Sequence, residues 1–111
     1  MKKILIALSV LATTQIAMAA ATSITKIKNI YVYQNYIVLK MENKHGNEYS
    51  CSHAKSNEFL YLDTTTSGGN RMYSAILSAS IAGRKVKLGY SLCGTWGSKT
   101  VPKAYGVTIV K

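Results

Sequence analysis

The first nineteen residues limit what this chain can fold into, because they predict export and leave a short remainder. Two lysines follow Met1, residues 4–12 form an apolar run, and the Ala-Met-Ala at 17–19 fits a cleavage site. This is the pattern of a secretory signal peptide, and the apolar run falls well short of the ~20 residues that a membrane span needs. We therefore expect residues 1–19 to be a signal peptide and the exported protein, periplasmic or secreted, to be residues 20–111.

The expected mature chain is small. Without the signal peptide, 111 residues become 92, and 12 of the 14 basic side chains remain against 4 acidic ones, a net charge of +8. A domain of this size cannot hold a dinucleotide-binding unit together with a substrate domain, nor a barrel enzyme. It is also close to the size at which one hydrophobic core is only marginally stable. We expect a single domain without a cofactor.

The cysteine content predicts a disulfide. Cys51 and Cys93 are the chain's only cysteines, and both lie in the exported part. In an oxidising compartment an isolated pair favours one bridge over two buried thiols. The bridge would close a loop of about forty residues and contribute roughly 4 kcal/mol by chain entropy, a large share of the stability of so small a domain.

Alternation of apolar and polar residues predicts five strands. In the segment that follows Asn35, for example, Ile37, Leu39 and Met41 share one face, as the two-residue period of a strand requires. The intervening stretches are rich in glycine and polar residues and are expected to be loops. The expected strands cover residues 24–33, 36–41, 59–63, 84–92 and 105–110, and the expected long loops cover residues 42–58 and 93–103.

One segment, residues 71–82, has helical periodicity. Met72, Ile76 and Ala79 fall on one face, hydroxyl side chains precede the segment, and Gly83 can end it with a positive φ. The order is then three strands, one helix and two strands. This is the arrangement of the OB-fold, a small five-stranded β-barrel with the helix between strands three and four. Closure buries one apolar face of every strand and removes most exposed edges.

Catalysis and metal binding have little support in the sequence. The mature chain has 4 carboxylates and 2 histidines, and Asp63 stands where a helix cap would. His45, Cys51 and His53 invite a zinc site, but their spacing fits no closed tetrahedral pattern, and Cys51 is expected in the disulfide. We expect a protein that is not an enzyme and binds no metal.

The basic charge favours an anionic partner. OB-folds bind single strands of nucleic acid in a basic groove with stacking aromatics, and Tyr31, Tyr33, Tyr36 and Lys40 could supply both. Export argues against nucleic acid, because that ligand is scarce outside the cytoplasm. Lipopolysaccharide, acidic sugars and phospholipid headgroups remain as anionic partners. A solvated lysine surface that only keeps the protein soluble is the plainer alternative.

Two clusters fit a glycan-binding site. Such sites place an aromatic ring against a sugar and polar groups at its hydroxyls. Trp96, Ser98 and Lys99 lie in the Gly/Ser-rich loop that follows the second cysteine, whereas Asn35 and Tyr36 lie at the turn between the first two strands. We predict these five as ligand-binding residues. Packing of the tryptophan against the disulfide is the alternative.

Residues 72–88 carry a family resemblance. Their sequence is Met-Tyr-Ser-Ala-Ile-Leu-Ser-Ala-Ser-Ile-Ala-Gly-Arg-Lys-Val-Lys-Leu. This run resembles the corresponding segment of receptor-binding B subunits of bacterial toxins with one A chain and five B chains. The Shiga type is closest in this segment, and the subtilase-cytotoxin and typhoid-toxin types share the plan. Elsewhere the resemblance is topological and reaches no sugar-site motif. The chain is also similar to small exported proteins with a Met-Tyr-Ser helix start and a Cys-x-x-Trp loop.

The resemblance implies an OB-fold with a disulfide, a homopentameric ring whose helices line the centre, a glycosylated receptor, and a toxin A chain as partner. Small helix residues such as Ser74, Ala75 and Ser78 would allow close packing in such a ring, and a monomer is the alternative. We predict an exported, non-catalytic module that recognises glycan or a cell-surface receptor. The alternatives are a periplasmic protein that binds anionic envelope polymer, and a partner of another secreted protein.

Overall fold

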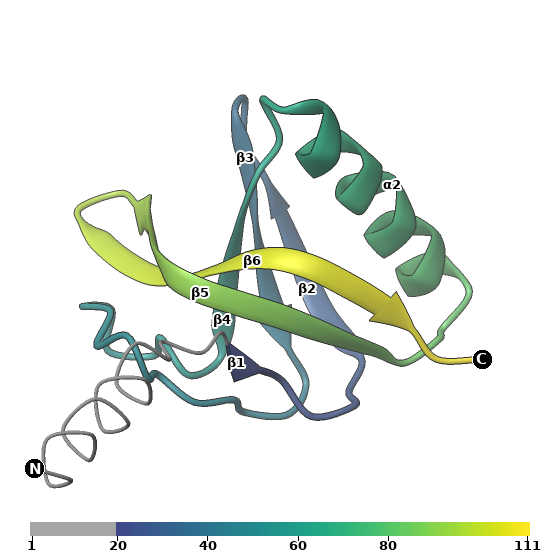
Figure 1. Ribbon diagram of the computed structural model, residues 1–111, viewed down its shortest axis with the longest axis horizontal. Coiled ribbons are helices and arrows are strands. Elements are labelled where there is room, and N and C mark those ends of the chain that lie inside the picture. Colours follow the sequence, from purple (N-terminus) through teal and green to yellow (C-terminus); the bar gives the residue numbers. More distant parts are fainter. Residues whose placement is uncertain (1–19) are drawn as a thin grey trace, which may run out of the picture.

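The computed structural model describes residues 20–111, which form six strands and one helix (Figure 1). The expected signal peptide, residues 1–19, lies outside the described residues. Within residues 20–111, no helix is long and apolar enough to cross a bilayer. In chain order the elements are β1 (Ala20–Ala21), β2 (Ile27–Val32), β3 (Tyr36–Met41), β4 (Phe59–Asp63), α2 (Ser67–Ile81), β5 (Val86–Trp96) and β6 (Lys99–Ile109).

The sheet is curved, and its two edge strands are connected directly by the chain segment between them. The strand order is β1-β5-β6-β4-β3-β2, and β1 and β2, at opposite ends of this order, follow one another in sequence. Between them, Thr25 pairs with Val86 of β5 through two backbone hydrogen bonds of 2.9 and 2.7 Å. All neighbouring strands are antiparallel except β4 and β6, which run parallel and meet at Tyr61 and Lys103. Figure 1 shows the long β5–β6 hairpin crossing the β2–β3–β4 sheet.

The expectation of an all-β domain with one helix is confirmed, whereas the expected number of strands is wrong. The structure has six strands rather than five, and the helix follows β4 rather than lying between a third and a fourth strand. The predicted strand 24–33 starts only at Ile27, because Thr25 pairs with β5 and the chain then turns to pair with β3. The extra strand, Ala20–Ala21, is too short for periodicity to show and is defined by its pairing with β5.

The predicted loop over residues 93–103 is also wrong, because it is the outer half of a hairpin. The fourth predicted strand continues to Trp96, and the fifth begins at Lys99 rather than at Tyr105. Gly97 makes the turn between them with φ +66°. Strands 36–41 and 59–63 are confirmed with the predicted bounds.

The main core lies between the helix and one face of the sheet. Alternate residues of β3 and β4 point to this face and pack against Ile76 and Ala79 of α2. The helix begins four residues before the predicted start, because the Thr66 hydroxyl caps it by accepting from the Gly69 amide at 2.9 Å. Gly83 follows the helix with φ +68°, as predicted. The buried sheet residues of this core are Ile37, Leu39, Met41, Leu60, Leu62, Val86, Leu88, Tyr90 and Ala104.

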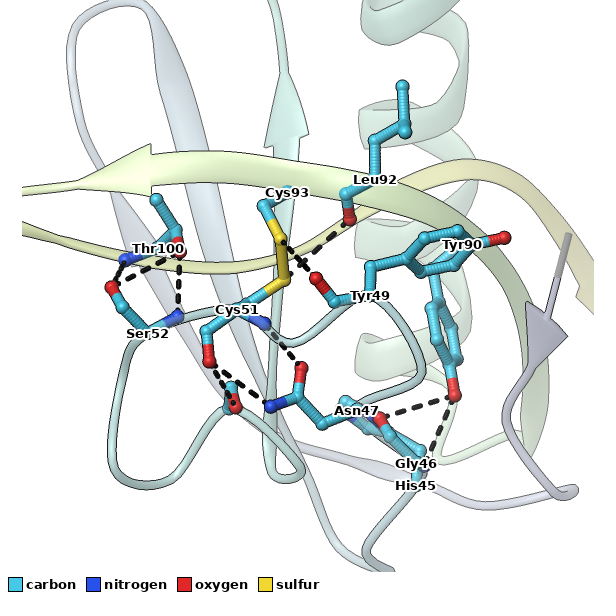
Figure 2. Close-up of a disulfide and its surroundings, with 11 residues drawn as sticks. His45, Gly46, Asn47, Tyr49, Cys51, Ser52, Tyr90, Leu92, Cys93 and Thr100 are labelled. Carbon is cyan, nitrogen blue, oxygen red and sulfur yellow. Dashed lines mark hydrogen bonds between the residues drawn. A yellow bond between two sulfur atoms is a disulfide. The ribbon is translucent and has the colours of Figure 1, made fainter.

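The predicted disulfide between Cys51 and Cys93 is confirmed (Figure 2). It joins the irregular segment between β3 and β4 to β5, next to Leu92, whose φ is +60°. Asn47 fixes Cys51 through two hydrogen bonds: its side chain accepts from the Cys51 amide at 2.9 Å and donates to the Cys51 carbonyl at 3.1 Å. The bridge therefore anchors this segment, which has no regular secondary structure of its own.

A second anchor holds the same segment to the outer half of the β5–β6 hairpin. The Ser52 amide donates to the Thr100 hydroxyl at 2.8 Å, and the Thr100 amide donates to the Ser52 hydroxyl at 2.9 Å. The His53 amide donates to the Thr100 carbonyl at 2.9 Å. These bonds hold His53 beside the hairpin, where its imidazole stacks on Trp96.

Candidate functional site

Strand alternation directs a set of aromatic side chains to the outer face of the sheet, opposite the main core. In β4, Leu60 and Leu62 are buried in the core, whereas Phe59 and Tyr61 belong to a second, smaller cluster with Val38 of β3. The outer half of the β5–β6 hairpin covers this cluster. We call the ring-bearing residues the aromatic face; they are Tyr31, Tyr33, Tyr36, His53, Phe59, Tyr61 and Trp96.

Three tyrosines form a stacked row on the aromatic face. The ring centroids of Tyr33 and Tyr36 are 4.8 Å apart with planes at 23°, and those of Tyr36 and Tyr61 are 4.8 Å apart with planes at 22°. Burial raises the pKa of the Tyr61 hydroxyl, and the nearby charge of Asp63 adds to this effect. The inner end of the row is closed, because Gly94 of β5 lies so near the Tyr61 ring that a Cβ at this position would overlap it. Tyr33, at the outer end, is 43 % exposed.

Trp96, at the end of β5, connects the β5–β6 hairpin to the row of stacked tyrosines. Its indole Nε1 donates to the Tyr33 hydroxyl at 3.1 Å. The indole stacks on Tyr31 (5.8 Å, 27°) and on His53 (5.2 Å, 13°) and meets the Phe59 ring at 4.9 Å with the planes tilted by 55°. Offset and tilted ring pairs of this kind add to the stability gained by burial alone. The indole of Trp96 is therefore packed against three other rings, and its N–H edge points to the Tyr33 hydroxyl.

The structure brings the two predicted clusters to the two sides of Tyr33. Asn35 and Tyr36 lie at the β2–β3 turn, where Tyr33 stacks on Tyr36. Trp96 is hydrogen-bonded to Tyr33, and the exposed residues Ser98 and Lys99 follow it across the hairpin turn. The Asn35 carbonyl accepts from the Thr64 amide at 3.1 Å, which holds this turn against the β4–α2 connection. The Asn35 side chain is exposed and makes no hydrogen bond within residues 20–111.

The sequence signalled only part of this surface. The sequence indicates Tyr31, Tyr33 and Tyr36 as stacking residues for nucleic acid and His53 only as a candidate zinc ligand. It does not single out Phe59 or Tyr61, and it does not place these tyrosines beside Trp96. The alternation of Phe59 and Tyr61 with Leu60 and Leu62 could have placed both rings on the outer face. Nothing in the sequence pattern indicates that the hairpin folds back over them.

Charged groups lie at the margins of the aromatic face. The Lys40 ammonium is 5.7 Å from the Phe59 ring centroid and 4.0 Å from a Glu58 carboxylate oxygen. At the other end of β4, the Asp63 carboxylate accepts hydrogen bonds from the amide and hydroxyl of Thr65, and these bonds hold its pKa below the usual range. The face therefore offers ring surfaces and phenol hydroxyls, with the exposed amide of Asn35 at the neighbouring turn and charge at its edges.

The residues weighed for a zinc site do not converge. Cys51 is in the disulfide, His45 is buried against Tyr90, and His53 stacks on the tryptophan. Burial lowers the pKa of the His45 imidazole, and its Nδ1 lies 2.8 Å from the Gly46 carbonyl oxygen. Among residues 20–111, no group of three or more His, Cys, Asp or Glu side chains is placed to hold a metal ion.

Comparison with family models, with curated proteins and with solved structures finds no match to this chain.

Proposed function

We propose that this chain is an exported, non-catalytic module that binds a glycan or a glycosylated receptor through the aromatic face. The observation that supports this most is the position of Tyr33 between two hairpin turns. Its exposed ring stacks on Tyr36 and its hydroxyl accepts a hydrogen bond from Trp96, and the exposed residues Asn35, Ser98 and Lys99 lie in or next to the two turns. A ring that packs against a sugar, with donors and acceptors around it for the hydroxyls, is what such a site requires.

Asn35, Tyr36, Trp96, Ser98 and Lys99 are the predicted contacts, and the geometry adds Tyr33 at their centre. Tyr36 and Trp96 act chiefly by holding that ring, since one stacks on it and the other donates to its hydroxyl. Asn35, Ser98 and Lys99 are exposed and available for sugar hydroxyls or a carboxylate.

The proposal includes an OB-type barrel. If β1 and β2 are taken as one bent strand, the order becomes first-second-third-fifth-fourth with the helix after the third strand, and the start of the first strand pairs with the fourth. This supports the resemblance to toxin B subunits.

We extend the proposal to a homopentamer that could carry a toxin A chain. Light scattering of the oxidised mature protein should give a mass near five chains; a single-chain mass at every concentration would contradict the ring while leaving the aromatic face intact.

A second candidate function rests on charge. Lys40 and Lys99 lie around the aromatic face, and the expected mature chain carries a net charge of +8. These favour an anionic envelope polymer or an acidic region of another secreted protein as ligand. Affinity for such a ligand should fall steeply as salt increases, whereas stacking on a neutral sugar should change little.

Substitution of Tyr33 by alanine tests the glycan proposal. On a glycan array, the oxidised mature protein should bind a defined set of glycans, and Tyr33→Ala should weaken binding about tenfold or more, because the central ring is lost. Tyr105→Ala is the matched control, since Tyr105 is also an exposed tyrosine (57 %) but lies on β6 outside the aromatic face. Equal binding by Tyr33→Ala and the wild type, with or without a change in Tyr105→Ala, would contradict the proposal.

A further inference from the structure

A cavity of about 540 Å³ lies apart from the aromatic face, between the first turn of α2 and the strands β4 and β6. This volume is within the range of small-molecule sites, roughly 300–1,000 Å³. Part of the lining is apolar, and Tyr105 forms one wall with its ring over Gly89. The apolar lining residues are Leu62, Met72, Ala75, Ala104 and Val107.

Two basic side chains from different elements also line the cavity. Arg71 comes from the first turns of α2, and its Nη2 lies 3.9 Å from the position that a Cβ would take at Gly68. Lys103 comes from β6, and its charge acts on Asp63, which also lines the cavity. Neither Arg71 nor Lys103 forms an ion pair within residues 20–111, where the recorded pair is between Lys40 and Glu58.

The charge of the lining is net positive by one unit. Asp63 is the acidic member, and one oxygen of its carboxylate already accepts two hydrogen bonds from Thr65, at 2.8 and 2.6 Å. The helix contributes no acid to its own first turn. The lining therefore carries one uncompensated positive charge. A singly charged carboxylate would neutralise this charge, and an apolar group attached to the carboxylate would contact the apolar lining residues.

We propose that this cavity binds a small amphipathic carboxylate, with the carboxylate between Arg71 and Lys103 and the apolar part against the floor formed by Leu62, Met72 and Ala75. The guanidinium can pair with both carboxylate oxygens, and the ammonium adds a point charge from β6. This site is separate from the aromatic face and does not depend on the glycan proposal.

The test uses 4-phenylbutyrate as the probe and the oxidised mature protein, followed by amide NMR and calorimetry. The probe should bind saturably, with amide shifts concentrated in the first turns of α2 and in the cavity-lining parts of β4 and β6. The uncharged analogue 4-phenylbutanol and inorganic phosphate should each bind about tenfold more weakly, because each lacks one half of the interaction. Probe binding at the aromatic face instead, or equal affinity for either analogue, would overturn the proposal.

Substitutions of the basic residues test which of them bind the carboxylate of the probe. Arg71→Gln and Lys103→Gln should each lower the affinity for 4-phenylbutyrate about tenfold. Lys85→Gln is the matched control, since it removes the same charge from an exposed residue that does not line the cavity. Ala75→Phe should fill the floor and abolish binding, and the amide spectrum of each variant shows whether it is folded. The same loss in Lys85→Gln as in the cavity variants would mean that only net charge matters, and the site would be refuted.

Discussion

Replacing Cys51 and Cys93 together by serine should lower the free energy of unfolding by about 4 kcal/mol, because the bridge closes a loop of 42 residues in the unfolded chain. The loss is expected to be large for a second reason. The segment between β3 and β4 is anchored at Cys51 and at Ser52, and it carries His53 to the aromatic face. Urea unfolding of the double serine variant and of the oxidised wild type measures the difference.

The reduced wild type is the control for this experiment. It lacks the bridge but keeps both sulfur atoms, so its unfolding curve should coincide with that of the double serine variant if the bridge itself is responsible. A difference between oxidised and reduced protein of less than about 1 kcal/mol would mean that the native contacts of the segment hold it without the bridge, contrary to our account.

Gly69→Ala should destabilise the protein by about 3 kcal/mol or more. Gly69 is buried in the first turn of α2, and a Cβ there would overlap the backbone carbonyl oxygen of Asp63 at the end of β4. A backbone oxygen cannot swing aside as a flexible side chain can. The helix would have to move away from the strand, and the Thr66 cap, whose hydroxyl accepts from the Gly69 amide, would be disturbed with it.

The neighbouring glycine provides the control. At Gly68 a Cβ would meet nothing nearer than Arg71 Nη2, at 3.9 Å. Gly68→Ala should therefore be neutral or stabilising by up to about 1 kcal/mol, because alanine favours the helix and restricts the unfolded chain. Thermal or urea unfolding of both variants tests the opposite signs. A similar effect at the two positions would show that α2 does not pack against β4 as described.

Strands with a clear apolar period were predictable, and the hairpin tip was not. In β3 and β4 every second residue faces the main core, as the sequence period predicts, so their bounds could be predicted even though Val38, on the other face of β3, is also buried. The outer half of β5 and β6 contains Gly94, Gly97 and Pro102, which are typical of loops. Pro102 is accommodated because it lies opposite Cys93, beside the irregular register of β5, where the regular ladder is interrupted.

The candidate site was predicted as two separate clusters because its assembly depends on that hairpin. Tyr36 and Trp96 are far apart in sequence, and Tyr33 links them only when β5 and β6 cross the outer face of the sheet. Sequence periodicity can assign a residue to a face of a strand. It cannot show that Gly94 approaches the Tyr61 ring, because that contact is set by tertiary packing.

The central claim, that the aromatic face binds glycan, is tested most directly by the fluorescence of Trp96, the chain's only tryptophan. Its indole donates to Tyr33, so a ligand on that ring should change the tryptophan emission. Titration with the strongest neutral glycan from the array should give a saturable change in emission with nearly the same midpoint at low and high salt. Binding seen by calorimetry without any change in emission, or binding that disappears at high salt, would contradict the account.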